Sequence, residues 1–138
     1  MVKGLLTGLI AVALWSVASA AGAVANDTAS TRYGAVGLDP KSLFVGFVTG
    51  VANADDALAR LEVTCDAAGA TCTEAHAFHD QCAALARAAS SSATDALGLS
   101  VHDTRAAAQQ GALAECQKNG GEGCNIHDTY CAPADLDE

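Results

Sequence analysis

Basic side chains are scarce in this chain. Seven Lys and Arg residues stand against sixteen Asp and Glu residues, so the formal net charge of the 138-residue chain is −9 at neutral pH. A surface of this sign repels the phosphates of nucleic acids and the headgroups of anionic lipids. We therefore expect no nucleic acid among the partners, and no membrane once a leader has been removed. Residues 132–138 are interpreted as a solvated acidic tail.

Motifs for nucleotides, cofactors and nucleophilic catalysis are missing as well. The sequence contains no phosphate-binding P-loop, no dinucleotide-binding fingerprint and no calcium-binding loop. The serine run at 90–92 lacks the G-x-S-x-G turn that presents a nucleophilic hydroxyl, so it is interpreted as a flexible turn. His102-Asp103 is interpreted as the approach to a helix, not as a catalytic pair. We therefore predict no cofactor and no catalytic residue.

The first 25 residues have the features of a secretory signal peptide. Lys3 is the only charge before an uncharged stretch over residues 4–25, and small residues precede two candidate cleavage sites. We predict cleavage after Ala25, with cleavage after Ala20 as the second choice. The alternative is an uncleaved anchor, because the uncharged stretch is long enough to span a bilayer core of about 30 Å. Export predicts a secreted, periplasmic or cell-envelope protein in which residues 26–32 form a flexible leader.

Cysteine is the most informative residue type that the chain contains. The six cysteines fall in two sets of three at similar spacing: Cys65, Cys72 and Cys82, then Cys116, Cys124 and Cys131. In an exported domain with few aromatic residues we expect all six to form disulfides, which leaves no thiol for catalysis. Six cysteines allow fifteen pairings. The repeated spacing favours Cys65–Cys72, Cys116–Cys124 and Cys82–Cys131, with the last pair as a crosslink between the two halves.

The order of the expected elements repeats with the cysteines. In the first unit, residues 33–81, we predict strands over 33–38 and 43–49, a helix between Asn53 and Cys65, and a strand over 72–78. In the second unit, residues 82–131, we predict strands over 82–86 and 94–100, a helix over 105–117 after Thr104, and a strand over 124–130. Asn53 and Thr104 are residue types that cap helix N-termini.

These patterns predict an α+β fold over residues 33–131. We expect two pseudo-repeated ββαβ units that share one mainly antiparallel sheet, with both helices on one face of it and three disulfides. Each unit alone is too small to bury its apolar face, so the two halves are expected to share one core.

One cluster has the residue types that bind a metal ion. Glu74 and His76 lie two residues apart on a predicted strand, so their side chains share a face, and His79 at the following turn is a third candidate ligand. The alternative is that both histidines are solvated polar residues. Cys82, which follows closely, is expected in a disulfide. No metal site is therefore predicted, and these three residues stay as weak candidates.

Several short segments together resemble one known family. They are Tyr33-Gly34-Ala35-Val36, the helix end at 59–65, the strand start at 82–86, the helix end at 112–116, residues 121–124, and Tyr130-Cys131. This ordered set with six cysteines is similar to the bacterial family named domain of unknown function 4189. The resemblance implies a small exported domain with no assigned enzymatic activity. In that family the second strand of each unit carries glycine and aromatic residues; here residues 94–100 keep only Gly98.

We consider two kinds of function. The first is a secreted, disulfide-stapled, non-catalytic module that binds a protein at the cell envelope or outside the cell, and a host protein if the source is a pathogen. The second is a secreted hydrolase or metal-binding enzyme that uses Glu74, His76 and His79. The negative charge, the export signal and the missing catalytic motifs favour the first.

Overall fold

A computed structural model describes residues 32–91 and 96–136, and each half of the chain forms a three-stranded antiparallel sheet with one helix. The predicted signal peptide, residues 26–31 and residues 137–138 lie outside the described residues. The first half contains β1 (Tyr33–Asp39), β2 (Phe44–Val51), α1 (Ala54–Ala67) and β3 (Glu74–His79). The second contains β4 (Gln81–Arg87), β6 (Leu97–His102), α2 (Arg105–Lys118) and β8 (Asn125–Ala132). A small third sheet pairs β5 (Ser90–Ser91) with β7 (Gly121–Glu122).

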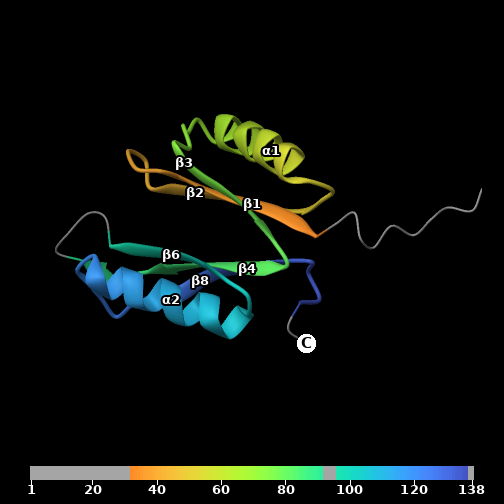
Figure 1. Ribbon diagram of the computed structural model, residues 1–138. Coiled ribbons are helices and arrows are strands. Elements are labelled where there is room, and N and C mark those ends of the chain that lie inside the picture. Colours follow the sequence, from red (N-terminus) through yellow and green to blue (C-terminus); the bar gives the residue numbers. More distant parts are fainter. Residues whose placement is uncertain (1–31, 92–95, 137–138) are drawn as a thin grey trace, which may run out of the picture.

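The two main sheets face each other, with one helix on each outer side. Their strand orders are β2-β1-β3 and β6-β4-β8, so the first strand of each half lies in the middle of its sheet. Figure 1 shows the resulting layers, in the order α1, first sheet, second sheet, α2. The α+β class, the ββαβ order and the antiparallel pairing are confirmed. The expectation of one shared sheet is wrong, because the two halves form separate sheets. The expectation that both helices lie on one face is also wrong, because they lie on opposite outer sides.

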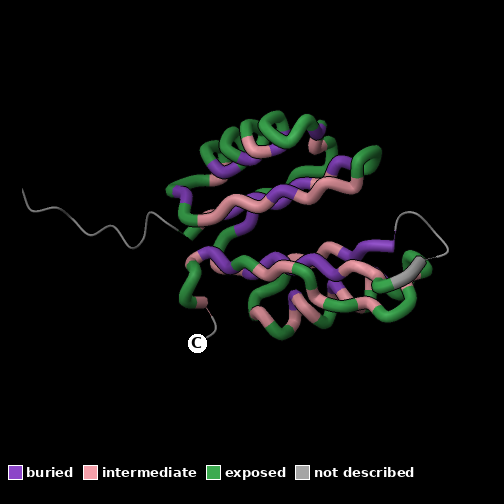
Figure 2. Tube along the Cα trace, turned by 180° about the vertical axis from the view of Figure 1, so that it is seen from behind, coloured by how far each residue is buried: buried purple, intermediate pink, exposed green. Residues whose placement is uncertain are grey.

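Burial along the central strands explains why two sheets form. In β1, Ala35 packs under α1, while its neighbour Val36 packs between the sheets, and both are fully buried. In β4, Ala84 faces α2 and Ala83 faces the first sheet, again without exposure. Because successive side chains of a strand point to opposite faces, continuous burial requires a cover on each side. A helix supplies one cover and the opposite sheet supplies the other, and Figure 2 shows buried residues along the strands of both sheets.

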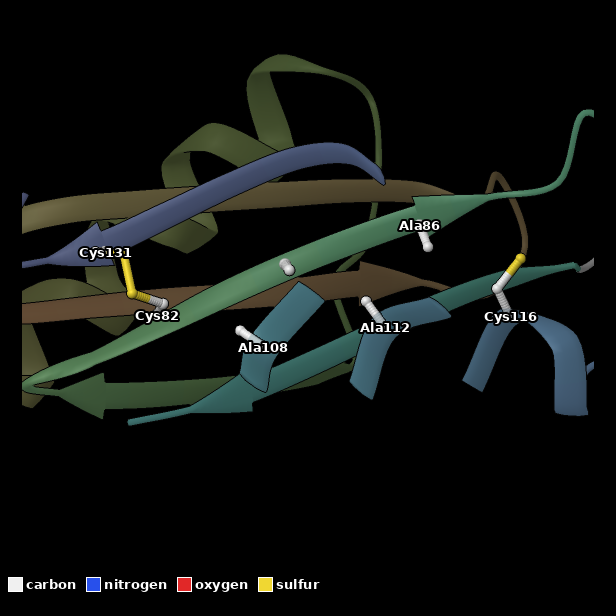
Figure 3. Close-up of a cluster of buried hydrophobic side chains, with 7 residues drawn as sticks. Cys82, Ala86, Ala108, Ala112, Cys116 and Cys131 are labelled. Carbon is white, nitrogen blue, oxygen red and sulfur yellow. A yellow bond between two sulfur atoms is a disulfide. The ribbon is translucent and has the colours of Figure 1, made fainter. Parts of the chain in front are cut away.

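Small side chains allow the helices to lie close to the sheets. Both predicted N-caps form: Asn53 Oδ1 accepts from the Asp56 N–H at 2.9 Å, and Thr104 Oγ1 accepts from the Ala107 N–H at 3.2 Å. α1 buries Ala57, Leu61 and Cys65, and α2 buries Ala108, Ala112 and Cys116. Figure 3 shows Ala112 of α2 near Ala86 of β4, and Ala108 of α2 farther along β4 toward Cys82. Alanine is therefore the main core residue of the second half.

The disulfides join the predicted partners. Cys65–Cys72 and Cys116–Cys124 each tie the end of a helix to the segment that follows it, and Cys82–Cys131 is the third bond. Its predicted role as a crosslink between the halves is wrong. Cys82 and Cys131 are directly paired residues on β4 and β8, which are neighbours in the same sheet. In the first sheet the corresponding pair is Tyr33 and His79, whose rings lie 4.4 Å apart.

Several predicted boundaries differ from the structure. Ser90 and Ser91 form β5 against β7 instead of a flexible turn, and β6 begins at Leu97, while residues 94 and 95 of the predicted strand lie outside the described residues. β3 begins at Glu74, two residues later than predicted, because Cys72 is held at the end of α1 by its disulfide. Of the helices in the described part of the chain, none has the length and apolar character needed to cross a membrane.

Asp39 fixes the turn between β1 and β2. Its carboxylate accepts hydrogen bonds from the Lys41 N–H at 2.9 Å, the Ser42 hydroxyl at 2.8 Å and the Thr71 N–H at 3.1 Å. These three donors stabilise the charged form and lower the pKa of Asp39 to about 2, with the Lys41 N–H as the largest cause. Since Thr71 follows α1, the same carboxylate also holds the start of the chain segment that leads into β3.

Candidate functional site: an open cleft between the sheets

A cleft of about 430 Å³ between β3 and β6 combines apolar walls with polar side chains. Its apolar walls come from Val36 and Leu38 of β1 and from Leu97, Leu99 and Val101 of β6. Ala77 lies on the β3 side. Ligand sites in proteins are typically 300–1,000 Å³ with mostly apolar walls and a few polar groups. The cleft therefore has the size and lining of a binding site for an apolar group.

The cleft is open because the two sides of the sandwich are filled differently. On the opposite side β2 lies against β8, and the rings of Phe47 and Tyr130 are 4.9 Å apart. When the two halves are compared strand by strand, Leu99 of β6 matches Phe47 of β2, and Phe78 of β3 matches Tyr130 of β8. Leu99 and Phe78 therefore take the places of these two residues on the open side. Phe78 is buried in the cluster between the sheets, and Leu99 packs against that cluster. No aromatic contact closes this side within the described residues.

Glu74 and His76 are the polar residues that β3 contributes to the cleft. They pair with Leu38 and Val36 of β1, and all four side chains lie on the face of the first sheet that looks toward the second. β3 is exposed because it is an edge strand of its sheet, whereas Val36 lies on the central strand β1 and is buried between the sheets. The sequence pattern placed Glu74 and His76 on one strand face, and the structure brings them to the same cleft.

His79, the third candidate, lies elsewhere. Its ring contacts Tyr33 on the helix side of the first sheet, and its Nδ1 lies 3.2 Å from an Asp80 carboxylate oxygen. His79 lies three positions after His76, an odd step along the strand, so the two side chains point to opposite faces of β3. In the described part of the chain, no three His, Cys, Asp or Glu side chains are grouped in a way that would hold a metal ion. All six cysteines are in disulfides.

Residues from α2 complete the cleft, and these were not expected from the sequence. Glu115 and Asn119 reach the cleft past the edge strand β6, near Glu74 on the other side. The Asn119 side-chain amide donates to the Leu97 carbonyl at 2.9 Å, and Lys118 Nζ lies 3.5 Å from a Glu115 carboxylate oxygen. Within the described residues Glu74 has no ion-pair partner. The polar part of the cleft therefore combines two carboxylates, Glu74 and Glu115, with His76, Ser100 and Asn119.

The residues that build both halves match one family. The model of the family described as Domain of unknown function (DUF4189) matches residues 33–131, which span every strand and helix except the last residue of β8. The chain belongs to this family. Neither the curated proteins nor the solved structures include a match to the chain. The DUF4189 region contains the cleft and the three disulfides, and it ends before the acidic residues at the end of the chain.

The fold of this DUF4189 domain also limits where it works. Three disulfides in a small domain indicate an oxidising, extracytoplasmic environment. In that environment the cleft exposes apolar walls beside the carboxylates of Glu74 and Glu115.

Proposed function

We propose that this DUF4189 domain is a secreted, non-catalytic protein-binding module that works at the cell envelope or outside the cell. The cleft between β3 and β6 receives a segment of the partner protein. The observation that carries this proposal is the unfilled apolar volume of about 430 Å³, walled by Leu97, Leu99 and Val101 on one side and by β3 on the other. If the source is a pathogen, a host protein is the natural partner.

The chemistry of the cleft supports binding better than catalysis. A general acid–base or metal-dependent reaction needs several reactive groups that converge on one point. Here Glu74 and His76 share the cleft, but His79 faces the other side of β3 and contacts Tyr33. Burial of apolar side chains is the main driving force of protein association, and the cleft offers such burial together with a polar rim.

A selection from a random twelve-residue peptide display library, with the oxidised protein as target, tests the proposal. We expect selected peptides to bind the unaltered protein and to lose at least tenfold in affinity for Leu99→Trp, which fills the cleft. Leu38→Trp is a second cleft-filling variant at a half-buried position, in case the first does not fold. Native near-UV circular dichroism of each variant separates blocked binding from unfolding.

Val63→Trp is the matched control, because Val63 is 68% exposed on α1 and lines a separate groove between α1 and β2. Binding that is lost in Val63→Trp but kept in both cleft variants would place the site in that groove and contradict the proposal. A failure to select any peptide that binds the folded protein would contradict it as well.

Secretion has its own test. The intact mass of the protein exported by an expressing bacterium is expected to lack residues 1–25. A mass that lacks residues 1–20 would indicate the second cleavage site. Retention of the full N-terminus would favour the anchored form of the protein instead.

The alternative function is a hydrolase or metal-binding enzyme at Glu74 and His76, and one observation favours it: both residues line the same partly enclosed cleft. Metal analysis of the purified protein, together with a hydrolase substrate panel on the unaltered protein and on His76→Ala, decides the matter. Bound metal or hydrolysis that disappears in His76→Ala would replace the binding proposal.

A further inference from the structure

We propose that the cleft binds its partner by strand addition: an extended, basic segment pairs with the free edge of β3 and turns apolar side chains into the cleft. This inference rests on the proposed function and adds the binding mode and the charge of the partner. It follows from a comparison of the four edge strands of the two sheets, which are β2, β3, β6 and β8.

Three of these edges carry features that hinder pairing with another strand. The β1–β2 ladder shifts register between Tyr33 and Ala35, opposite the bulged end of β2, and the β4–β8 ladder shifts between Leu85 and Ala86. On β6, the outward-facing carbonyl of Leu97 already accepts a hydrogen bond from the side-chain amide of Asn119. Bulges and side-chain covers are the devices by which natural sheets protect their edges.

The edge of β3 has none of these features. Its six residues pair with β1 without a register shift, and they include no proline. The Asp80 N–H donates to the Arg32 carbonyl at 3.2 Å, which shows that the even-numbered residues turn their backbone groups toward β1. Ala75 and Ala77 therefore turn their N–H and C=O groups outward. Both residues are exposed, and within the described residues no backbone bond outside the β1–β3 ladder involves them.

Side chains beside this edge leave room for a further strand. Ala75 and Ala77 are the smallest chiral residues and point to the α1 side of the sheet, where Ala75 lines a neighbouring groove of about 350 Å³. On the other side lies the cleft, with Leu99 and Val101 across from β3. A strand added to β3 would alternate its side chains between these two sides, so every second residue would enter the cleft.

The negative charges that line the cleft indicate which residues the partner segment carries. Glu74 and Glu115 line the cleft, and of these two only Glu115 has an ion-pair partner within the described residues, Lys118 at 3.5 Å. The whole chain carries a net charge of −9, which opposes pairing with a second copy of itself. An inward-facing Lys or Arg on the partner would lie beside Glu74, next to apolar residues that cover Leu99 and Val101. The occupant is therefore an extended segment that alternates and carries basic residues on its inward face.

The peptides from the display selection provide the test of the binding mode. Strand addition uses the N–H groups of alternate peptide residues, so we expect N-methylation to weaken binding at least tenfold at every second position and to have little effect at the positions between. On the protein, hydrogen exchange of the Ala75 and Ala77 amides is expected to slow in the complex. Glu74→Gln and Glu115→Gln are each expected to weaken binding about threefold to fivefold, with Glu122→Gln at an exposed position of β7 as the control.

The possible outcomes separate the two proposals. Peptides that bind in the cleft without the alternating N-methyl effect, or without slower exchange at Ala75 and Ala77, overturn strand addition and leave the protein-binding function standing. Binding that is indifferent to both glutamine variants overturns the basic character of the partner. If the protein forms a concentration-dependent dimer in which hydrogen exchange of the Ala75 and Ala77 amides is slowed, the edge of β3 binds a second copy of the chain. That result would also contradict the inference.

Discussion

The ring of Phe47 in the first sheet lies 4.9 Å from the ring of Tyr130 in the second sheet. This contact closes one side of the sandwich, while the opposite side, between β3 and β6, remains an open cleft. The two halves thus follow the same strand order but differ in how their edges meet, and the difference creates the candidate site.

The contact between Phe47 and Tyr130 is expected to contribute to stability as a pair. Phe47→Ala and Tyr130→Ala each remove one ring, and the double variant removes both. Because tilted aromatic pairs contribute about 0.5–1.5 kcal/mol beyond their buried area, we expect a coupling energy in that range. Urea unfolding of the four proteins in a double-mutant cycle measures it. Strict additivity of the two losses would show that the sheets are held together without this contact.

The long disulfide is expected to contribute more to stability than either short one. Cys82–Cys131 closes a loop with a sequence separation of 49, against 7 for Cys65–Cys72 and 8 for Cys116–Cys124. Chain entropy then predicts a loss of about 4 kcal/mol for a Cys82→Ala/Cys131→Ala variant and about 2.4 kcal/mol for each other pair. Denaturant unfolding of the three double variants gives the order. A larger loss from either short loop would indicate that native-state packing, not loop length, sets the contribution.

Gly98 and Gly46 occupy matching places under the two helices but tolerate change differently. A Cβ atom at Gly98 would lie well inside contact distance of the Ala112 carbonyl oxygen, which is backbone and cannot move aside. At Gly46 the nearest atoms are Leu61 Cδ1 at 3.1 Å and Cys65 Sγ at 3.4 Å. We expect Gly98→Ala to reduce the free energy of unfolding by about 3 kcal/mol or more, and Gly46→Ala by about 1 kcal/mol.

Thermal or urea unfolding of both glycine variants provides the comparison. Equal losses would mean that α2 can lift away from β6 without cost. That result would contradict the close packing of the alanine-rich second half.

The pKa of Asp39 predicts how stability depends on acid. The carboxyl has a pKa of about 2 in the folded protein and an ordinary value near 3.8 when unfolded. The unfolded state therefore takes up a proton first, and the contribution of Asp39 is complete above about pH 4 and decreases as the pH falls toward 2. Asp39→Asn is expected to unfold more easily at neutral pH and to lose less stability between pH 4 and pH 2.

Unfolding curves at several pH values between 2 and 6 measure this dependence. Asp66→Asn, at an exposed position of α1, removes a charge of the same sign and serves as the control. A pH dependence that is the same in Asp39→Asn and in the unaltered protein would show that the hydrogen bonds from Lys41, Ser42 and Thr71 do not hold the carboxylate.

Local signals in the sequence were sufficient for the six main strands, the two helices and the disulfides, but not for the small β5–β7 pair. Asn53 and Thr104 cap their helices as predicted, because an N-cap depends on residues within one turn. The repeated cysteine spacing was enough for the three pairs. The role of Cys82–Cys131 was misread because Cys82 opens the second unit and Cys131 ends it. Their match in spacing does not make them equivalent positions, and the strand register shows them as neighbours.

The packing of the two sheets against each other depends on contacts between residues far apart in the sequence. The hydrophobic pattern along one strand does not specify these contacts. The one available signal was the lack of polar alternation in residues 33–38 and 82–86, since strands that are apolar at successive positions are buried on both sides. The cleft was harder to predict. Glu74 and His76 were noted for their chemistry, but Leu99, Glu115 and Asn119 meet them only because the edges of β3 and β6 come together in the fold.

The most direct test of the account is a map of backbone amide shifts in the ¹⁵N-labelled, oxidised protein during titration with the tightest selected peptide. We predict that the largest changes lie on β3 and β6, at Ala75, Ala77, Leu99 and Val101, and that Thr49 and Val63 beside the α1–β2 groove change little. Changes centred on Thr49 and Val63, or spread evenly over the surface, would contradict the claim that the cleft is the binding site.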